Sequence, residues 1–440
     1  MIGRAFSPSA RSYGIHALRR VTDTSGTSIY FEFELPVPGG GSSGVRWAYA
    51  VPDDASDLTR DVVLSIAYDG DVYLALLDLS SLRRNAASGD VNAARASISW
   101  SRLALPAAAT ARGYTGVADH AHVAAFGSHW ISAQLAGGPR LAESASTLND
   151  LWLFRVDRRQ LGGGGTIAPD REVLVYASDY NSAWRLDPLV SDTARAYATN
   201  DHFMVATPEG VAVAIKHVQN KALRFLVVDP RLLLLTADVT FLGTVGSPTK
   251  LECDTTGSAR GPAGAASPAA WRVMVPDTVL LNVADNVLQV FDTDASLSDA
   301  TILGRGTPNF QATLPGYSLQ MPSFVRLPNG DSVLALKLVP CSTAATGPTY
   351  SDNSPVVDDW GYLWLAVWDA TFSSMSSPVP LQVTVSSTAA GAPGGNRPHV
   401  SRWGNFILTC WEEADLDSTK QTAQASNFRS YLRVDVLVPS

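Results

Sequence analysis

Four of the seven histidines in the chain lie in short motifs of similar pattern. They are His120 and His122 in ADHAHVA, His202 in DHFMVA, and His399 in RPHV. A neutral imidazole is a common ligand of transition metals and can also accept or donate a proton near neutral pH. On an extended strand, residues two apart face the same side, so His120 and His122 would point together.

Each of these motifs opens an apolar run, and we predict the runs to be equivalent strands at the mouth of a central channel. The predicted ligand-binding set is His120, His122, His202, Arg397 and His399. A divalent metal held by His120, His122 and His202 is the more specific hypothesis. We favour a simpler interpretation, in which these side chains ring a water-filled channel and hydrogen-bond neighbouring strands. No carboxylate completes a recognised metal-ligand spacing, so no cofactor is expected.

Trp360 is a further candidate for ligand contact, in the run 358–362 (DDWGY). An aromatic face beside carboxylates suits stacking and hydrogen bonding of a sugar ring. Trp364 and Trp368 lie within the apolar run that follows, where packing between neighbouring sheets is the favoured role. Trp360 therefore joins the predicted ligand-binding set and would belong to a glycan-binding protein.

Two other motifs match known sites only in part. Residues 40–44 (GGSSG) fit the G-x-S-x-G pattern of a nucleophile, but they lie in a Gly/Ser/Pro linker, so a spacer is favoured. Residues 292–299 (DTDASLSD) have the oxygen spacing of a calcium loop without its glycine and final glutamate, which favours a solvated turn. Three cysteines are an odd number and predict no disulfide framework.

The elements that would position these residues are strands, because one type of apolar run recurs along the chain. The recurring runs are 72–78 (VYLALLD), 151–157 (LWLFRVD), 223–229 (LRFLVVD), 288–294 (LQVFDTD), 363–369 (LWLAVWD) and 431–437 (YLRVDVL). Successive runs begin about 65 to 80 residues apart, and regular repetition in a strand-rich chain indicates radial repetition. The sequence therefore predicts an all-β fold of the β-propeller type.

Each repeat can be aligned as four strands, with a turn between the first two. The turns 52–53 (PD), 208–210 (PEG), 276–277 (PD) and 328–330 (PNG) fall at that place. The last repeat lacks a fourth strand, so we predict that a hairpin at residues 13–36 completes it. Six four-stranded blades are expected, with seven as the alternative. We therefore divide the chain into residues 1–44, which form the hairpin and linker, and residues 45–440, which form the propeller.

Composition limits the function classes. With 46% hydrophobic and 17% charged residues among 440, the chain can bury a large core. The net charge of −8 without a basic block argues against a nucleic-acid partner. No apolar run is long enough to cross a membrane, and the first residues lack the apolar core of a signal peptide. We therefore expect the protein to be synthesised in the cytoplasm, and its association with a virion is one further outcome.

The repeated pattern resembles the six-bladed propellers of the broad sialidase-like and lectin group. The resemblance is architectural, because no S-x-D-x-G-x-x-W box occurs and no catalytic residue of that group can be placed on this chain. A catalytic signature is also missing elsewhere. We therefore expect a non-enzymatic binding or structural propeller, a subunit of a larger assembly such as a virion, phage tail or surface structure. A glycan-binding lectin and a glycoside or phosphoester hydrolase acting at the channel mouth are the alternatives.

Overall fold

The structure of the protein, a computed structural model, consists mainly of strands in the part of the chain that it describes. The described residues are 13–17, 21–22, 28–29, 31–52, 61–84, 90–105, 107–111, 113–125, 129–136, 151–176, 199–206, 211–217, 222–229, 234–241, 271–278, 286–293, 303–304, 317–327, 331–340, 362–368, 379–381, 393–416 and 425–439. Within these residues no helix is long and apolar enough to span a membrane.

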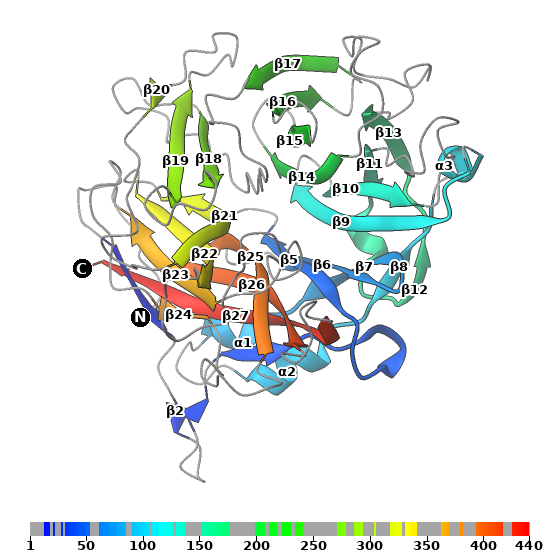
Figure 1. Ribbon diagram of the computed structural model, residues 1–440. Helices are drawn as coiled ribbons and strands as arrows, with labels where there is room; N and C mark the ends of the chain where they lie inside the picture. Colours follow the sequence, from blue (N-terminus) through cyan, green and yellow to red (C-terminus); the bar gives the residue numbers. More distant parts are fainter. Residues whose placement is uncertain are drawn as a thin grey trace.

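The strands form six larger sheets that follow one another along the chain (Figure 1). The first sheet contains β5 (Arg46–Pro52), β6 (Val62–Tyr68), β7 (Asp71–Leu77), β8 (Ser101–Leu103) and β12 (Gly165–Ile167). The second contains β9 (Gly116–Ala125), β10 (His129–Ala136), β11 (Leu151–Val156) and β13 (Arg171–Tyr176). The third contains β14 (Thr199–Ala206), β15 (Val211–His217), β16 (Ala222–Asp229) and β17 (Leu234–Phe241).

The remaining sheets come from the second half of the chain and from its first residues. The fourth contains β18 (Trp271–Thr278), β19 (Asn286–Thr293) and β20 (Leu303–Gly304). The fifth contains β21 (Tyr317–Arg326), β22 (Ser332–Pro340), β23 (Tyr362–Trp368) and β24 (Val379–Pro380). The sixth contains β25 (Pro393–Trp403), β26 (Phe406–Leu416) and β27 (Ala425–Pro439), with β1 (Tyr13–Ala17) and β4 (Glu32–Glu34) both paired to β27. A separate small ladder joins β2 (Val21–Thr22) to β3 (Ser28–Ile29).

The first strand of each sheet lies toward the centre of the molecule (Figure 1). These inner strands contact one another in the order β14, β9, β5, β25, β21 and β18. Sheets of antiparallel strands arranged radially in this way are the architecture of a β-propeller, and the sequence-based prediction of that fold is confirmed. The number of blades and the closure of the ring stay predictions.

The six recurring runs of the sequence all form strands. In five sheets they are the third strand from the centre, namely β7, β11, β16, β23 and β27. The fourth sheet differs, because Pro276 and Asp277 lie within β18 rather than in a turn, and β18 pairs directly with β19. The predicted break into two strands is therefore wrong there. Pro276 lacks an N–H group, and β18 tolerates it as the terminal strand of its sheet.

Three short helices modify the expected all-β fold. They are α1 (Ser80–Arg84), α2 (Val91–Ala96) and α3 (Ala107–Ala111). The carboxylate of Asp90 accepts hydrogen bonds from the backbone N–H groups of Asn92 (2.9 Å) and Ala93 (3.0 Å), which caps α2. Alignment of the first repeat predicts its fourth strand at residues 96–103, but Ala96 is the last residue of α2 and the strand β8 begins only at Ser101.

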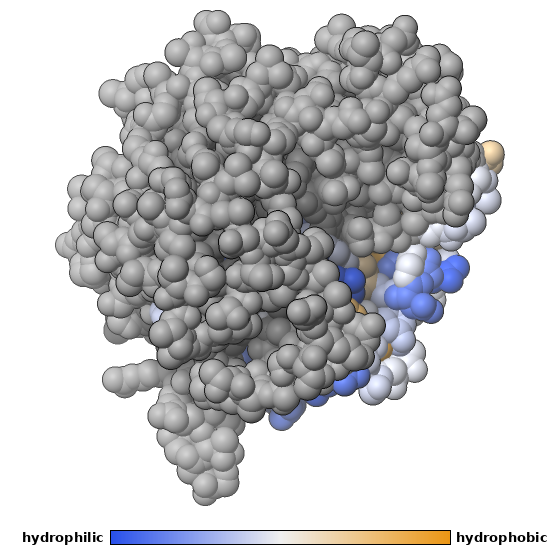
Figure 2. All heavy atoms as spheres, in the orientation of Figure 1, coloured by the Kyte–Doolittle hydropathy of each residue, from blue (hydrophilic) through white to orange (hydrophobic). Residues whose placement is uncertain are grey.

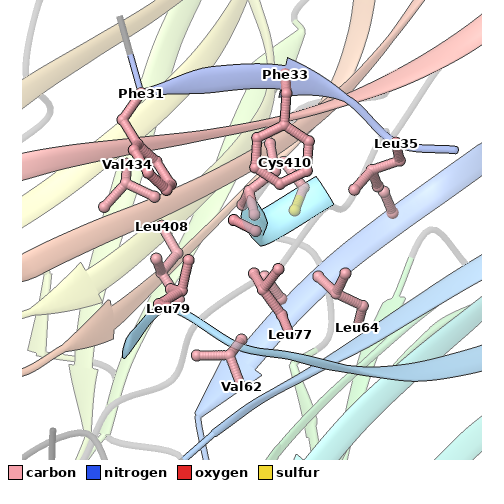
Figure 3. Packing of buried hydrophobic residues seen from close by; sticks show 14 of the residues in the cluster. Phe31, Phe33, Leu35, Val62, Leu64, Leu77, Leu79, Leu408, Cys410 and Val434 are labelled. Atoms are coloured by element: carbon pink, nitrogen blue, oxygen red, sulfur yellow. The ribbon is translucent and has the colours of Figure 1, made fainter. Parts of the chain in front are cut away.

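The hydrophobic core consists of clusters of side chains that lie between neighbouring sheets. Between the first and sixth sheets, the segment 31–35 alternates buried apolar residues with half-buried acidic residues that face the other way. Figure 3 shows that Phe31, Phe33 and Leu35 project from β4 and its flanking residues toward side chains of both sheets. Burial of a side chain of this size stabilises the fold by about 1.5 to 3 kcal/mol. The N-terminal segment is thus part of the core and also pairs through β4 with β27.

Charged residues occupy the outer part of the first and second sheets. Around the place where Figure 1 shows β8 and β12, the residues coloured in Figure 2 are mostly hydrophilic. Ion pairs of this region are Arg102 with Asp71 (3.2 Å), Arg158 with Asp61 (2.8 Å) and Arg155 with Asp170 (2.6 Å). Solvent-exposed pairs of this kind contribute about 0 to 1 kcal/mol each, so stability comes mainly from the cores between the sheets.

Candidate functional site

The inner strands share an irregularity that determines where their side chains point. Five of them shift register against their partner strand at a similar level. The shifts lie between Arg46 and Tyr49 in β5, opposite Ala133 and Leu135 in β9, between Thr199 and His202 in β14, between Gln320 and Ser323 in β21, and between Asn396 and His399 in β25. Such bulges redirect side chains and are frequent beside functional sites.

Three rings meet just beyond these bulges, one from each of three adjacent inner strands. The ring centroid of Tyr49 on β5 is 4.2 Å from that of His122 on β9 and 4.6 Å from that of His399 on β25. The two imidazole centroids are 6.3 Å apart. All three side chains are buried, with 3 to 8% of their surface exposed. The rings therefore pack against one another and connect the sixth, first and second sheets.

Burial determines the charge of the His399 imidazole. Desolvation lowers the pKa of His399 to about 3, so the ring is neutral at physiological pH. Its Nδ1 atom has no hydrogen-bond partner within the described residues. Neutral imidazole is the form that binds metals, but no group of three His, Cys, Asp or Glu side chains is placed to hold a metal in that part of the chain. The metal hypothesis stays a prediction.

A second cluster surrounds the buried carboxylate of Glu412 on β26. Arg397 donates from Nη1 to Glu412 Oε1 at 2.8 Å, and Arg46 donates from Nε to Glu412 Oε2 at 3.3 Å. Glu412 is 1% exposed. Burial raises the pKa of Glu412, but the two guanidinium groups lower it by more, so its pKa lies below the usual value. Glu412 is therefore an ionised link between the bulges of β5 and β25.

Aromatic rings cover the faces of both guanidinium groups. The Cζ atom of Arg397 is 3.2 Å from the ring centroid of Trp47. The Cζ atom of Arg46 is 5.0 Å from the ring centroid of Trp47 and 4.4 Å from that of Phe428 on β27. These cation–π contacts hold both arginines in fixed orientations.

Unusual backbone conformations are concentrated around this cluster. Trp47 (φ 55°), Arg397 (φ 48°) and Asn427 (φ 54°) all adopt the left-handed region. Asparagine tolerates it, but for Trp47 and Arg397 it costs about 1 to 3 kcal/mol each. The surrounding contacts offset this cost. Strained residues are typical of functional sites, so the conformation itself points to the β5 and β25 bulges.

Hydrogen bonds between sheets accompany the two clusters. The Val400 backbone N–H donates to Ser323 Oγ at 3.0 Å, which joins β25 to β21. The hydroxyl of Ser65 donates to the carbonyl oxygen of Ala121 at 3.3 Å, which joins the first sheet to the second. Polar groups of β6 and of the inner strands β9, β21 and β25 thus link adjacent sheets, but none of these residues belongs to the predicted ligand-binding set, whose hydrogen-bonding role stays a prediction. The rings themselves are packed and buried rather than exposed to a water-filled channel.

Another buried charged group lies beneath β4, away from the inner strands. Arg433 donates to Asp435 Oδ1 from Nε (3.0 Å) and Nη2 (2.8 Å). Glu32 of β4 is the register partner of Arg433. Burial raises the pKa of Glu32 to about 7, and the nearby Glu413 and Asp435 act in the same direction against the attraction of Arg433. Burial also raises the pKa of Asp435.

The structure describes the side chains of only some of the predicted site residues. Three of them, His122, Arg397 and His399, lie in the two adjoining clusters. His120 is on β9 and His202 is on β14, but their side chains lie outside what the structure describes, as does Trp360 altogether. The pairing of β9 with β10 shifts register between Val117 and Ala121, and the shared direction of His120 and His122 stays a prediction.

Sequence reasoning missed Tyr49, Trp47, Arg46 and Glu412. Tyr49 follows the register shift of β5 as His399 follows that of β25, and this equivalence becomes visible only once the strands are paired. Glu412 could not be linked to Arg46 without the fold, since the two are far apart in the chain. The G-x-S-x-G motif is no nucleophile elbow. It overlaps a 3-10 helix (η1, Pro38–Gly40) and is followed by strand β5.

No protein-family model matches the chain, and no curated protein matches its sequence. Among solved structures, it is similar to a protein of unknown function from Dyadobacter fermentans, with 9% identity, 96% of this chain and 99% of that chain covered, and a TM-score of 0.50. It is also similar to the Dos1 propeller (11% identity, 94% and 82% covered, TM-score 0.34). A periplasmic gluconolactonase of Pseudomonas aeruginosa is a further similar structure (11% identity, 88% and 82% covered, TM-score 0.37). At these identities, likeness concerns the fold alone.

Proposed function

We propose that this β-propeller is a non-catalytic binding or structural protein that acts as a subunit of a larger assembly, such as a virion, phage tail or surface structure. Its six four-stranded blades would be closed by the N-terminal hairpin on β27. The observation that carries the proposal is that the reactive side chains of the inner strands and of β26 make contacts between sheets. Glu412, Tyr49, His122 and His399 connect neighbouring sheets to one another.

The chemistry of these groups supports binding over hydrolysis. Glycoside hydrolysis commonly requires two carboxyl groups, one of which donates or accepts a proton. The carboxylate of Glu412 is held by two guanidinium groups and has a lowered pKa, so it is a poor proton donor. The thiol of Cys410 is fully buried and desolvation raises its pKa, so it is a poor nucleophile.

Native mass spectrometry of the purified full chain, with elemental analysis, tests this proposal. We expect complexes of several subunits, without bound metal, at micromolar concentration. The same sample is assayed against nitrophenyl glycosides and phosphate esters and on a glycan array. A metal-loaded monomer that turns over a substrate would overturn the proposal. If turnover is lost in both His122→Ala and His399→Ala, hydrolysis occurs at the channel mouth.

Glycan binding without turnover would instead favour the lectin alternative. In that case, Trp360→Ala should abolish binding, because an indole that stacks on a sugar supplies most of its contact area. Trp364→Ala serves as the matched control, since Trp364 lies within β23 and is paired in register with Leu336 and Pro380. Binding that survives in the Trp360 variant would remove Trp360 from the site.

A further inference from the structure

Two guanidinium groups share the one carboxylate of Glu412. Arg46 and Arg397 carry one positive charge each, and both donate to the single carboxylate of Glu412. The three groups together therefore keep one net positive charge. A partly buried charge is stabilised when an opposite charge lies within hydrogen-bond distance.

Arg46 is placed to present hydrogen-bond donors outward. Its Nε atom bonds to Glu412, while Trp47 and Phe428 cover the plane of its guanidinium group. Its side chain is 31% exposed, against 18% for Arg397 and 1% for Glu412. A guanidinium group fixed in this way offers its two terminal nitrogens as a fork that matches a carboxylate, sulfate or phosphate group.

Two buried polar atoms on the neighbouring β25 bulge lack a partner within the described residues. One is Nδ2 of Asn396, whose side chain is 0% exposed and whose Oδ1 accepts a hydrogen bond from the Arg397 backbone N–H at 3.0 Å. Asn396 is also the register partner of Glu412. The other atom is Nδ1 of His399. A buried amide donor without an acceptor is costly, and an oxygen atom of a ligand would satisfy it.

We propose that Arg46, Arg397 and Asn396 form a binding site for a small oxyanion group, the carboxylate, sulfate or phosphate ester of a ligand. Arg46 would bind the anion through its terminal nitrogens, with Asn396 as a second donor. The partly exposed guanidinium of Arg46 and the buried amide of Asn396, whose Nδ2 lacks a partner within the described residues, both favour a ligand of this kind. The inference names a ligand chemistry for the proposed binding function and rests on it.

Calorimetric titration of the full chain tests this site. The probes are sodium sulfate, sodium phosphate and sodium acetate, at an ionic strength held constant with sodium chloride. We expect saturable binding of at least one probe, and the three arms distinguish tetrahedral from planar oxyanions. Arg46→Gln should weaken binding by about tenfold or more, because it removes a charge-assisted hydrogen bond. It leaves Arg397 and Glu412 as a neutral pair, so the fold should persist.

Arg102→Gln is the matched control, because Arg102 is an exposed arginine on β8 that pairs with Asp71. Its affinity for each probe should equal that of the wild type. Absence of saturable binding for all three anions, or unchanged affinity in Arg46→Gln, would overturn the site. Assembly in the native mass spectrum is a separate readout. A chain that assembles but binds no anion would refute this inference alone, and a monomer that binds anions through Arg46 would refute the assembly proposal alone.

Discussion

The guanidinium group of Arg397 lies against the ring of Trp47, 3.2 Å from its centroid, and both residues have a left-handed backbone conformation. Arg397 is on β25 and Trp47 is on β5, so the contact joins the sixth sheet to the first. The two bulges are therefore in direct contact through their strained residues. Glu412 completes this link by its hydrogen bonds to Arg397 and Arg46.

Substitution of Glu412 should strongly destabilise the fold. Glu412→Ala leaves two guanidinium groups beside each other without the carboxylate, and breaking a buried charge network costs about 3 to 5 kcal/mol. Urea denaturation measures the free energy of unfolding. The double variant Glu412→Gln with Arg397→Gln should recover part of the loss, because it removes one unpaired charge. Asp157→Asn, in an exposed pair with Arg159, should show no measurable change. Equal stability of Glu412→Ala and wild type would contradict the network.

Truncation of the Tyr49 side chain should strongly destabilise the fold. Tyr49→Ala removes the ring that lies between His122 and His399, and truncation of a buried aromatic costs about 3 to 5 kcal/mol. Tyr49→Phe keeps the ring and should lose much less. Thermal and urea unfolding of both variants check this. If Tyr49→Phe proves as unstable as Tyr49→Ala, hydrogen bonding would be the main contribution of Tyr49.

Glu32 should make stability fall as pH rises. Its pKa is about 7 in the folded chain, against the ordinary value of 4.5 for a solvated glutamate, so folding favours the protonated form. The contribution is favourable below pH 4.5 and is lost between about pH 4.5 and 7. Glu32→Gln should therefore be more stable than the wild type at pH 8, by on the order of 1 to 3 kcal/mol.

The control for this substitution is Glu34→Gln, on the same strand β4. The free energy of unfolding should be measured by urea denaturation from pH 4 to pH 9 for the three proteins. A pH profile that is identical in Glu32→Gln and the wild type would show that the carboxyl of Glu32 is not buried against β27. A change shared by Glu34→Gln would attribute the effect to net charge.

Burial of His399 should make the stability of the fold decrease as pH falls, the opposite of the effect of Glu32. Its pKa is lowered to about 3 from 6.5, so the folded chain favours the neutral ring. Its stabilising contribution is complete above pH 6.5 and is lost as pH falls toward 3. His399→Phe should therefore reduce acid destabilisation, by on the order of 1 to 2 kcal/mol at pH 5. Urea unfolding at pH 5 and pH 7 measures how much free energy of unfolding each protein loses on acidification. An equal loss in His399→Phe and the wild type would place the ring of His399 in contact with solvent.

Local patterns in the sequence were sufficient to predict the strands and the radial architecture. Runs such as 363–369 are apolar and bounded by polar residues, and that property depends only on neighbouring positions. The α2 helix was not predicted because Val91–Ala96 is only six residues long, which is too short to show the periodicity of an amphipathic helix. The sequence pattern places Pro276 in a turn because a terminal strand cannot be recognised before its sheet is known.

The candidate site could be predicted only where residues lie close together in the sequence. The RPH motif indicated Arg397 and His399, and the AHV motif indicated His122. The link from Arg46 to Glu412 joins residues 366 positions apart, so no spacing rule can reveal it. The left-handed conformation of Trp47 was equally hidden, because nothing about tryptophan favours it.

The pairing of β4 with β27 also limits when the protein can fold during synthesis. Glu34 is the partner of Tyr431, about 400 residues later in the chain. At about 5 to 20 residues per second, a ribosome would take roughly 20 to 80 seconds to travel between them. During that time β4 lacks the strand with which it pairs, and Phe31, Phe33 and Leu35 can pack only against the first sheet. The half of their contacts that the sixth sheet supplies is therefore open in the nascent chain, and a chaperone can bind there until β27 is synthesised.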